Sequence, residues 1–396
     1  MKNGQKLIFP YALVFYEAVL YLANDMYLPS LPRIARDLGT SQDMVQYTLS
    51  LWFMGTCSLQ IFLGPLSDRF GRRLILVWGA VLFFVSTCFC AMADSIEMLL
   101  VARFFQGSVV GTVTVAGYAA IHEFYDSRRT VQLLSIMASI IILAPAVGPI
   151  LGAWVIEFYS WRVIFFVLAG WGALGVVGLY FTMPKGGSRR KIRIKGVIED
   201  YKSLMRNSSF LKYALGFCFI LSSFFIWIVE GPFVIIEGLK LSPTVFGWMQ
   251  LFVFGCFGVG AQIAKILIKK RPVSELVRLS ILVTLSGAGL FVWMSLMMST
   301  HWVLITAAVM VISLGASMAF GSLNRLAIEA STVTMVNRTA VFSLLVSAIG
   351  TLACFVMTLF NNHTFLNLSF VMTAFLILGA ALIWPGSKRI RFLEDA

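Results

Sequence analysis

Apolar runs of about 20 residues recur along this chain of 396 residues, and they constrain its fold more than any other feature. Each run is long enough to cross roughly 30 Å of hydrocarbon as a helix. Charged residues make up 12% of the chain, whereas a soluble domain carries about 25%. A β-barrel would alternate apolar and polar residues, and these runs are continuous. The sequence therefore predicts an all-α membrane protein.

We predict twelve transmembrane helices in two six-helix halves around a central cavity, an arrangement common among transporters. The predicted spans are 7–28, 45–66, 74–93, 98–121, 131–155, 161–182, 213–236, 245–267, 279–298, 302–323, 339–360 and 365–384. The longest polar interval divides them equally. The predicted parts are an N-terminal half (1–183), a cytoplasmic basic linker (184–212), a C-terminal half (213–386) and a cytoplasmic tail (387–396).

The net charge of +13 follows the predicted topology. With the N-terminus in the cytoplasm, 26 of the 31 Lys and Arg residues lie on the cytoplasmic side. The exceptions are Arg33, Arg36, Arg162 and Lys240 outside, and Arg103 within a span. This asymmetry is the positive-inside rule. We therefore expect both termini in the cytoplasm, a lipid bilayer around the chain, and no nucleic-acid partner.

Apart from Arg162 and Lys265 next to span ends, four charged residues lie within predicted spans: Glu17 and Asp25 in the first, Arg103 in the fourth, and Glu230 in the seventh. A charge near the bilayer centre costs roughly 2.5–3.5 kcal/mol, so such residues usually face a cavity or a partner. Burial favours the protonated form of a carboxylate, which makes Glu17 and Asp25 candidates for proton binding.

Arg103 stays charged when buried and needs an anion or a polar network. Asp25 lies at a similar predicted depth and is the first partner to expect. Snorkelling of Arg103 to the outer interface is the alternative. Glu230 lies near the outer end of its span, where a wetted outer vestibule is the alternative to a binding role.

Other polar residues give little evidence of enzymatic or metal chemistry. The six Cys residues all fall within predicted spans without metal-ligand spacing, so they behave as small hydrophobes. The three His residues, His122, His301 and His363, lie at span ends, so we expect no His proton relay. The chain has no P-loop and no credible nucleophile arrangement. We expect no enzyme, no cofactor and no metal.

The loop after the second span reads Gly64-Pro65-Leu66-Ser67-Asp68-Arg69-Phe70-Gly71-Arg72-Arg73. Gly64 is expected to permit close helix approach. Asp68 can bond helix N-terminal amides or Arg side chains, and the Arg residues anchor the cytoplasmic face. The candidate residues of this loop are Gly64, Asp68, Arg69, Gly71, Arg72 and Arg73.

The fifth span carries Pro145, Gly148, Pro149 and Gly152. The prolines remove backbone donors and bend the helix. The two glycines, four residues apart, leave a smooth face for a neighbouring helix. We expect a kinked helix that packs closely on another span.

The loop Gly64 to Arg73 resembles the signature of the major facilitator superfamily at nearly every position. Over residues 8–160 the chain also resembles the drug:proton antiporter family, including the Bcr/CflA-type exporters. The residues that carry this likeness are Tyr16, Glu17, Tyr21, Asn24, Asp25, Met26, Arg103, Gln106, Gly117, Tyr118, Ala119, Ala120, Ile121, Glu123 and Met137. In that family the loop is a conformational latch, and the Pro-Gly run of span five is an antiporter signature.

The resemblance implies roles for individual residues. Proton coupling would fall to Glu17, Asp25 and Arg103. The expected substrate-binding residues are Tyr21, Asn24, Gln106, Tyr118, Met137, Trp227 and Glu230. Glu230 departs from the family pattern, which has an uncharged amide at that position. This departure leaves two readings open: a second proton or cation site, or an altered substrate range.

The implied function is a proton-coupled multidrug efflux antiporter, working by alternating access in the bacterial inner membrane. It would export lipophilic and cationic compounds, use protons as the coupling ion, and act as a monomer. Glu230 and a thinner resemblance in the second half keep a second reading open, the export of one specific metabolite, amino acid or siderophore. A receptor or scaffold would have no need of three membrane carboxylates.

Overall fold

The computed structural model describes residues 3–184, 194–360 and 362–384, and for a few helical residues, Asp68 among them, the backbone alone. Parts of the predicted linker (185–193) and the predicted tail (387–396) lie outside the described residues. The described chain is helical and contains no β-strand. It divides into two compact units, Met1–Ile194 (unit 1) and Lys195–Ala396 (unit 2).

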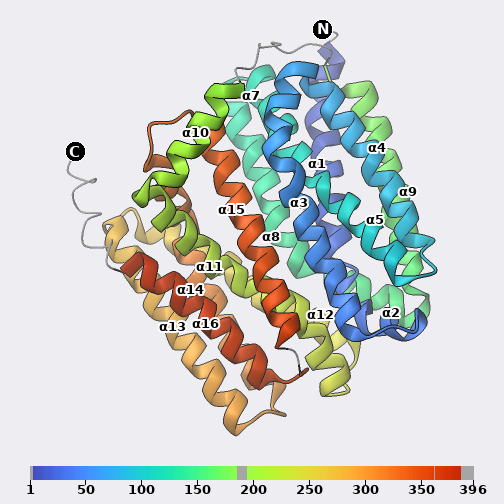
Figure 1. The fold of residues 1–396 in the computed structure, drawn as a ribbon, viewed down its shortest axis with the longest axis vertical. Helices are drawn as coiled ribbons and strands as arrows, with labels where there is room; N and C mark the ends of the chain where they lie inside the picture. Colours follow the sequence, from blue (N-terminus) through green and yellow to red (C-terminus); the bar gives the residue numbers. More distant parts are fainter. Residues whose placement is uncertain (1–2, 185–193, 361, 385–396) are drawn as a thin grey trace. The chain divides into compact units, whose positions relative to one another are not determined.

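Unit 1 is built around helix α1, which packs against α8 and α9, while α5 packs against α3 and α4 (Figure 1). Its elements are α1 (Asn3–Asp25), η1 (Leu28–Ser30), α2 (Leu31–Asp37), α3 (Gln42–Phe70), α4 (Arg72–Ala91), α5 (Ile96–Ser108), α6 (Val110–Thr112), η2 (Val113–Gly117), α7 (Tyr118–Phe124), α8 (Ser127–Phe158) and α9 (Trp161–Thr182). The segments α5 to α7 form one span, Ile96–Phe124, interrupted by the π-helical turn η2.

Unit 2 is centred on α11, which packs against α14, α15 and α16. Its elements are α10 (Ile194–Arg206), α11 (Ser208–Pro232), η3 (Phe233–Gly238), α12 (Pro243–Leu267), α13 (Val273–Met297), α14 (Trp302–Glu329), α15 (Met335–Leu359) and α16 (Phe365–Ile383). The turn η3 is also π-helical and continues α11.

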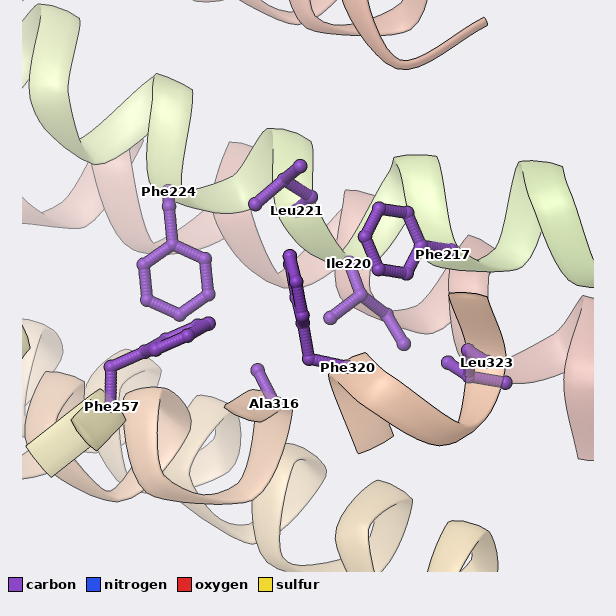
Figure 2. Close-up of a pocket in the computed structure, with 8 residues that line it drawn as sticks. All are labelled: Phe217, Ile220, Leu221, Phe224, Phe257, Ala316, Phe320 and Leu323. Atoms are coloured by element: carbon purple, nitrogen blue, oxygen red, sulfur yellow. The ribbon is translucent and has the colours of Figure 1, made fainter. Parts of the chain in front are cut away.

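Aromatic side chains fill the interior of unit 2. Figure 2 shows Phe217 and Phe224 of α11 facing Phe257 of α12 and Phe320 of α14 around a small apolar pocket. The pocket has a volume of about 10 Å³, whereas drug-sized ligands need roughly 300–1,000 Å³. This cluster therefore packs the helices together and is too small to bind a substrate.

Each of the twelve predicted spans coincides with a long helix or a run of helices, and the all-α membrane class is confirmed. Within the described residues, nine helices are long and apolar enough to cross a membrane, and bent α8 makes a tenth. The remaining two spans correspond to α1 and α3, of 23 and 29 residues.

Polar residues at the helix starts explain where several spans begin. A Ser, Thr, Asp or Asn side chain at the N-cap accepts an otherwise unpaired backbone N–H of the first turn. Such caps begin α3, α5, α8, α9, α11, α12 and α16, and they are Ser41, Ser95, Asp126, Ser160, Asn207, Ser242 and Thr364. The helix ends are therefore encoded locally, beside the apolar runs.

Candidate functional site

Helix α1 carries three polar residues at intervals of four, which places Glu17, Tyr21 and Asp25 on one face. The exposed fractions of Glu17 and Asp25 are 0% and 3%, and Tyr21 is half-buried. The two carboxylates are about 12 Å apart along the helix axis at 1.5 Å per residue. Both acidic groups predicted from the sequence are therefore enclosed by protein.

Glu17 has one partnered oxygen and one free oxygen. The hydroxyl of Tyr118, the first residue of α7, donates to Glu17 Oε1 at 2.6 Å. Glu17 Oε2 is buried and accepts no hydrogen bond from any described residue. A buried polar atom without a partner is costly, so this oxygen favours a proton or a cation. Tyr118 directly follows the π-helical turn η2, a feature frequent at functional sites.

Arg103 of α5 is fully buried, so the snorkelling alternative is wrong. Its guanidinium donates to the backbone oxygen of Ala23 and to Asn24 Oδ1, both at 3.1 Å, and to Gln106 Oε1 at 2.5 Å. It also lies 4.5 Å from the ring centre of Tyr27. These contacts provide the polar network that a buried Arg requires.

The expected direct pair between Arg103 and Asp25 is absent from the described residues, where no ion pair joins the two side chains. Asn24 stands between them instead, since its Nδ2 donates to Asp25 Oδ1 at 3.3 Å. At the other end, Gln106 Nε2 donates to Thr87 Oγ1 at 2.8 Å. The result is a chain of hydrogen bonds from Thr87 through Gln106, Arg103 and Asn24 to Asp25.

The Pro-Gly run of α8 contacts the end of α1 that carries Asp25. A Cβ atom added at Gly148 would lie 2.7 Å from Asp25 Cβ, and one at Gly152 would clash with the backbone oxygen of Met26. The axis of α8 turns by 44° between Arg128–Ile141 and Leu143–Phe158. Pro145 has no N–H to donate to the carbonyl of Ile141, which explains the bend. The glycines of this motif thus allow α8 to pack closely against α1 at Asp25, one of the proton-coupling candidates.

The loop between α3 and α4 is tied to two other helices. Gly71 has a φ of 94°, a backbone conformation that glycine adopts readily. Arg72 pairs with Glu123 of α7 at 2.7 Å and donates to the backbone oxygen of Ala119, while Arg73 donates to the backbone oxygen of Tyr180 at 2.6 Å.

Other residues of this loop do not show the expected contacts. Arg69 stacks only on its neighbour Phe70, 5.2 Å from the ring centre, among the contacts described. A Cβ at Gly64 would meet no atom within 4 Å. The close helix approach predicted there is wrong for this structure. The Asp68 side chain lies outside the described part.

Met137 of α8 is fully buried. Sequence reasoning missed Thr87 and Tyr27, which support Arg103 from α4 and from the turn after α1. Thr87 gave no signal, because a threonine in an apolar span commonly bonds only its own helix backbone.

In unit 2, the predicted residues Trp227 and Glu230 of α11 are fully buried. Trp227 Nε1 donates to Gln250 Oε1 of α12 at 2.9 Å. Glu230 Oε1 lies 3.1 Å from Nδ1 of His363, in the turn between α15 and α16. Glu230 is therefore not a wetted vestibule residue, and His363 is not an isolated loop residue. The sequence analysis did not single out Gln250, and it set His363 aside as a histidine at a span end.

The sequence of the chain is similar to those of known membrane transporters. Residues 13–342 match the Major Facilitator Superfamily. The chain is 30% identical to the multidrug transporter MdfA of Edwardsiella ictaluri over 89% of this chain and 85% of that protein. It is 29% identical to MdfA of Yersinia pestis bv. Antiqua (96% and 94%), and 29% identical to the multidrug resistance protein MdtM of Salmonella typhimurium (82% and 79%).

Solved structures agree on the fold. A bacterial homologue of the human lysosomal transporter Spinster, in an inward-facing and unoccupied conformation, superposes with a TM-score of 0.77. It has 14% identity and covers 100% of this chain and 99% of its own. The D-xylose–proton symporter gives a TM-score of 0.75 at 16% identity, with 95% and 97% coverage. At these identities the likeness concerns the fold.

Proposed function

The chain belongs to the Major Facilitator Superfamily, and from this premise we propose that it is a proton-coupled multidrug efflux antiporter of the bacterial inner membrane. A member of this superfamily is a transporter and not an enzyme. The MdfA and MdtM relatives are named as multidrug proteins, which supports the export of several different drugs and does not favour a single specific metabolite. Within that range we propose lipophilic and cationic compounds as the exported class. Protons are the proposed coupling ion, and no cofactor is required.

The observation that carries the proposal is the buried carboxylate of Glu17 with one free oxygen. A cation or a proton satisfies that oxygen, and the two cannot occupy it together. When the site faces outward, protons neutralise Glu17 and Asp25, and the exported cation leaves. When the site faces the cytoplasm, both carboxylates lose their protons and the next cation binds. Exchange follows from this competition.

The hydrogen-bond chain through Asn24 supports separate roles for the two acids. Among the described hydrogen bonds, Arg103 is linked to Asp25 through Asn24, so a change of charge at Asp25 acts on a fixed, buried cation. We assign Asp25 and Arg103 to proton exchange, and Glu17 to both proton and cargo. Tyr21, Tyr118, Met137, Trp227 and Glu230 remain the proposed substrate contacts. Asn24 and Gln106 bond Arg103, which supports a positioning role for them.

The membrane voltage adds to this exchange when more than one proton enters for each monovalent cation that leaves. One elementary charge moved across 100 mV is worth about 2.3 kcal/mol. We further propose that both termini face the cytoplasm, in accord with the positive-inside asymmetry, and that a monomer is the transporting unit. Cysteine accessibility near each terminus in intact cells tests the orientation.

The decisive experiment measures drug-dependent proton release from the purified protein. Addition of a cationic drug should release protons from the wild type and none from the double variant Glu17→Gln, Asp25→Asn. The matched control is Glu237→Gln, which neutralises a carboxylate of η3 that pairs with Lys240 at 3.1 Å. Unchanged release from the double variant would overturn the coupling role. Absence of release from the wild type would overturn the antiport proposal.

A further inference from the structure

A fully buried carboxylate in unit 2 lies beside a histidine that reaches solvent. Glu230, at the end of α11, has an exposed fraction of 0%, while the His363 side chain is 28% exposed. The atoms Oε1 of Glu230 and Nδ1 of His363 are 3.1 Å apart. A carboxylate buried within a membrane is costly and marks a functional position by default. His363 connects this buried group to the exterior of the protein.

The position of His363 is set by two residues of η3 and by the backbone of its own turn. Its ring stacks on Phe233 at 5.4 Å and 26°. A Cβ at Gly238 would lie 2.8 Å from the backbone oxygen of His363, so glycine allows the turn to approach. His363 itself has a φ of 53°, a region that non-glycine residues rarely occupy. Such backbone positions cluster at functional sites.

The other charged groups near this end of unit 2 are already engaged or lie elsewhere. Glu237 of η3 pairs with Lys240 in the following turn at 3.1 Å. His301 lies exposed between α13 and α14. The charged residues of the helices around α11 lie at the opposite helix ends: Lys265 of α12, Glu275 and Arg278 of α13, Arg325 and Glu329 of α14, and Arg338 of α15. Glu230 and His363 are thus well separated from these groups along the helices.

We propose that Glu230 and His363 form a second proton-exchange site, in which His363 relays protons between solvent and the buried carboxylate. In the inward step, the N–H bond at His363 Nδ1 breaks and an O–H bond forms at Glu230 Oε1. The imidazolium becomes neutral imidazole and the carboxylate becomes a carboxylic acid, so charge is conserved. The reverse step returns the proton. The site is separate from Glu17 and Asp25, and only its use in transport rests on the proposed function.

Infrared difference spectroscopy of the purified full-length protein tests the site directly. In acid-minus-base spectra, the carboxylic-acid carbonyl band of Glu230 should be present in the wild type and in Glu237→Gln, and lost in Glu230→Gln. After transfer to D₂O, the isotope shift of that band should be at least tenfold slower in His363→Gln than in the control His301→Gln.

Two results would overturn the proposal. A spectrum of Glu230→Gln identical to that of the wild type would show that Glu230 does not exchange a proton. Isotope exchange in His363→Gln at the rate of the His301→Gln control would exclude the relay, and this variant keeps Glu230 in place should Glu230→Gln not fold. The measurement uses no exported compound, so its failure is distinguishable from failure of the antiport proposal.

Discussion

Arg103 donates a hydrogen bond to Asn24 Oδ1 at 3.1 Å, so the buried guanidinium contacts the neighbour of Asp25 and not its carboxylate. The amide nitrogen of Asn24 then donates to Asp25 Oδ1 at 3.3 Å. One amide side chain therefore faces a fixed positive charge with its oxygen and a titratable negative charge with its nitrogen. A protonation change at Asp25 reaches Arg103 through Asn24.

Asn24→Leu removes both of these hydrogen bonds while keeping the same branched shape and the same number of heavy side-chain atoms. A hydrogen bond to a charged group contributes about 1.5–3 kcal/mol. We therefore expect drug-dependent proton release to fall by about tenfold or more, with cation binding at Glu17 changed by less than about threefold. Proton release and equilibrium drug binding, measured on the same preparation, separate these outcomes. Equal losses of proton release and of drug binding would contradict a positioning role for Asn24.

Thr87→Val is the matched change at the far end of the same hydrogen-bond chain. It removes one neutral hydrogen bond, worth about 0.5–1.5 kcal/mol, from Gln106 and leaves Asn24 untouched. We expect a decrease in proton release of about threefold to tenfold, smaller than that of Asn24→Leu. A larger effect at Thr87 than at Asn24 would show that the network is organised from α4.

The fold was largely predictable, because a chain in hydrocarbon must satisfy its backbone polar groups within helices. Glu17 and Asp25 were predictable as functional residues, because a charged side chain within a membrane span has a high free-energy cost. The hydrogen-bond partner of Arg103 could not be predicted. Asn24 and Asp25 are adjacent on one helix, so they differ by only about 1.5 Å in depth along its axis, while their side chains point about 100° apart around it. His363 was set aside as a residue at a span end, because no pattern in the sequence indicates that its turn, with a positive φ at His363, brings the ring to Glu230 of α11.

Tyr118→Phe should weaken the binding of cations more than that of neutral compounds. The Tyr118 hydroxyl donates to Glu17 Oε1 at 2.6 Å and stabilises the charged carboxylate that a cation requires. Loss of a hydrogen bond to a charged group costs about 1.5–3 kcal/mol, or roughly tenfold or more in affinity. Equilibrium binding of one cationic and one neutral drug checks this difference. Equal weakening of both would indicate a general loss of packing at Tyr118.

Glu123→Gln should loosen the link between the α3–α4 loop and α7 with only a small loss of stability. The Arg72–Glu123 pair is partly exposed, with side-chain exposed fractions of 23% and 29%, and such pairs contribute roughly 0.2–1 kcal/mol. A double-mutant cycle with Arg72→Gln, followed by thermal unfolding, measures the coupling energy. Because Arg72 also donates to Ala119, its replacement should cost more than that of Glu123. Equal effects of the two single variants would contradict this asymmetry.

Gly148→Ala should disturb Asp25 directly. The added Cβ would lie 2.7 Å from Asp25 Cβ and 3.2 Å from the backbone nitrogen of Met26, so α1 or α8 must move. Overpacking of this kind costs about 1–3 kcal/mol. We expect a lower unfolding temperature and proton release reduced by about tenfold.

Gly170→Ala in α9 is the matched control, since its Cβ would meet no atom within 4 Å. It should keep wild-type proton release and raise the unfolding temperature slightly, because alanine restricts the unfolded chain by about 0.4–1 kcal/mol relative to glycine. Thermal unfolding and proton release, measured on the two variants purified in the same way, test whether the close contact at Gly148 is needed for coupling. If Gly148→Ala matched Gly170→Ala in both, the close fit of α8 against Asp25 would not be required for coupling, and the kink at Pro145 would remain as the functional part of the motif.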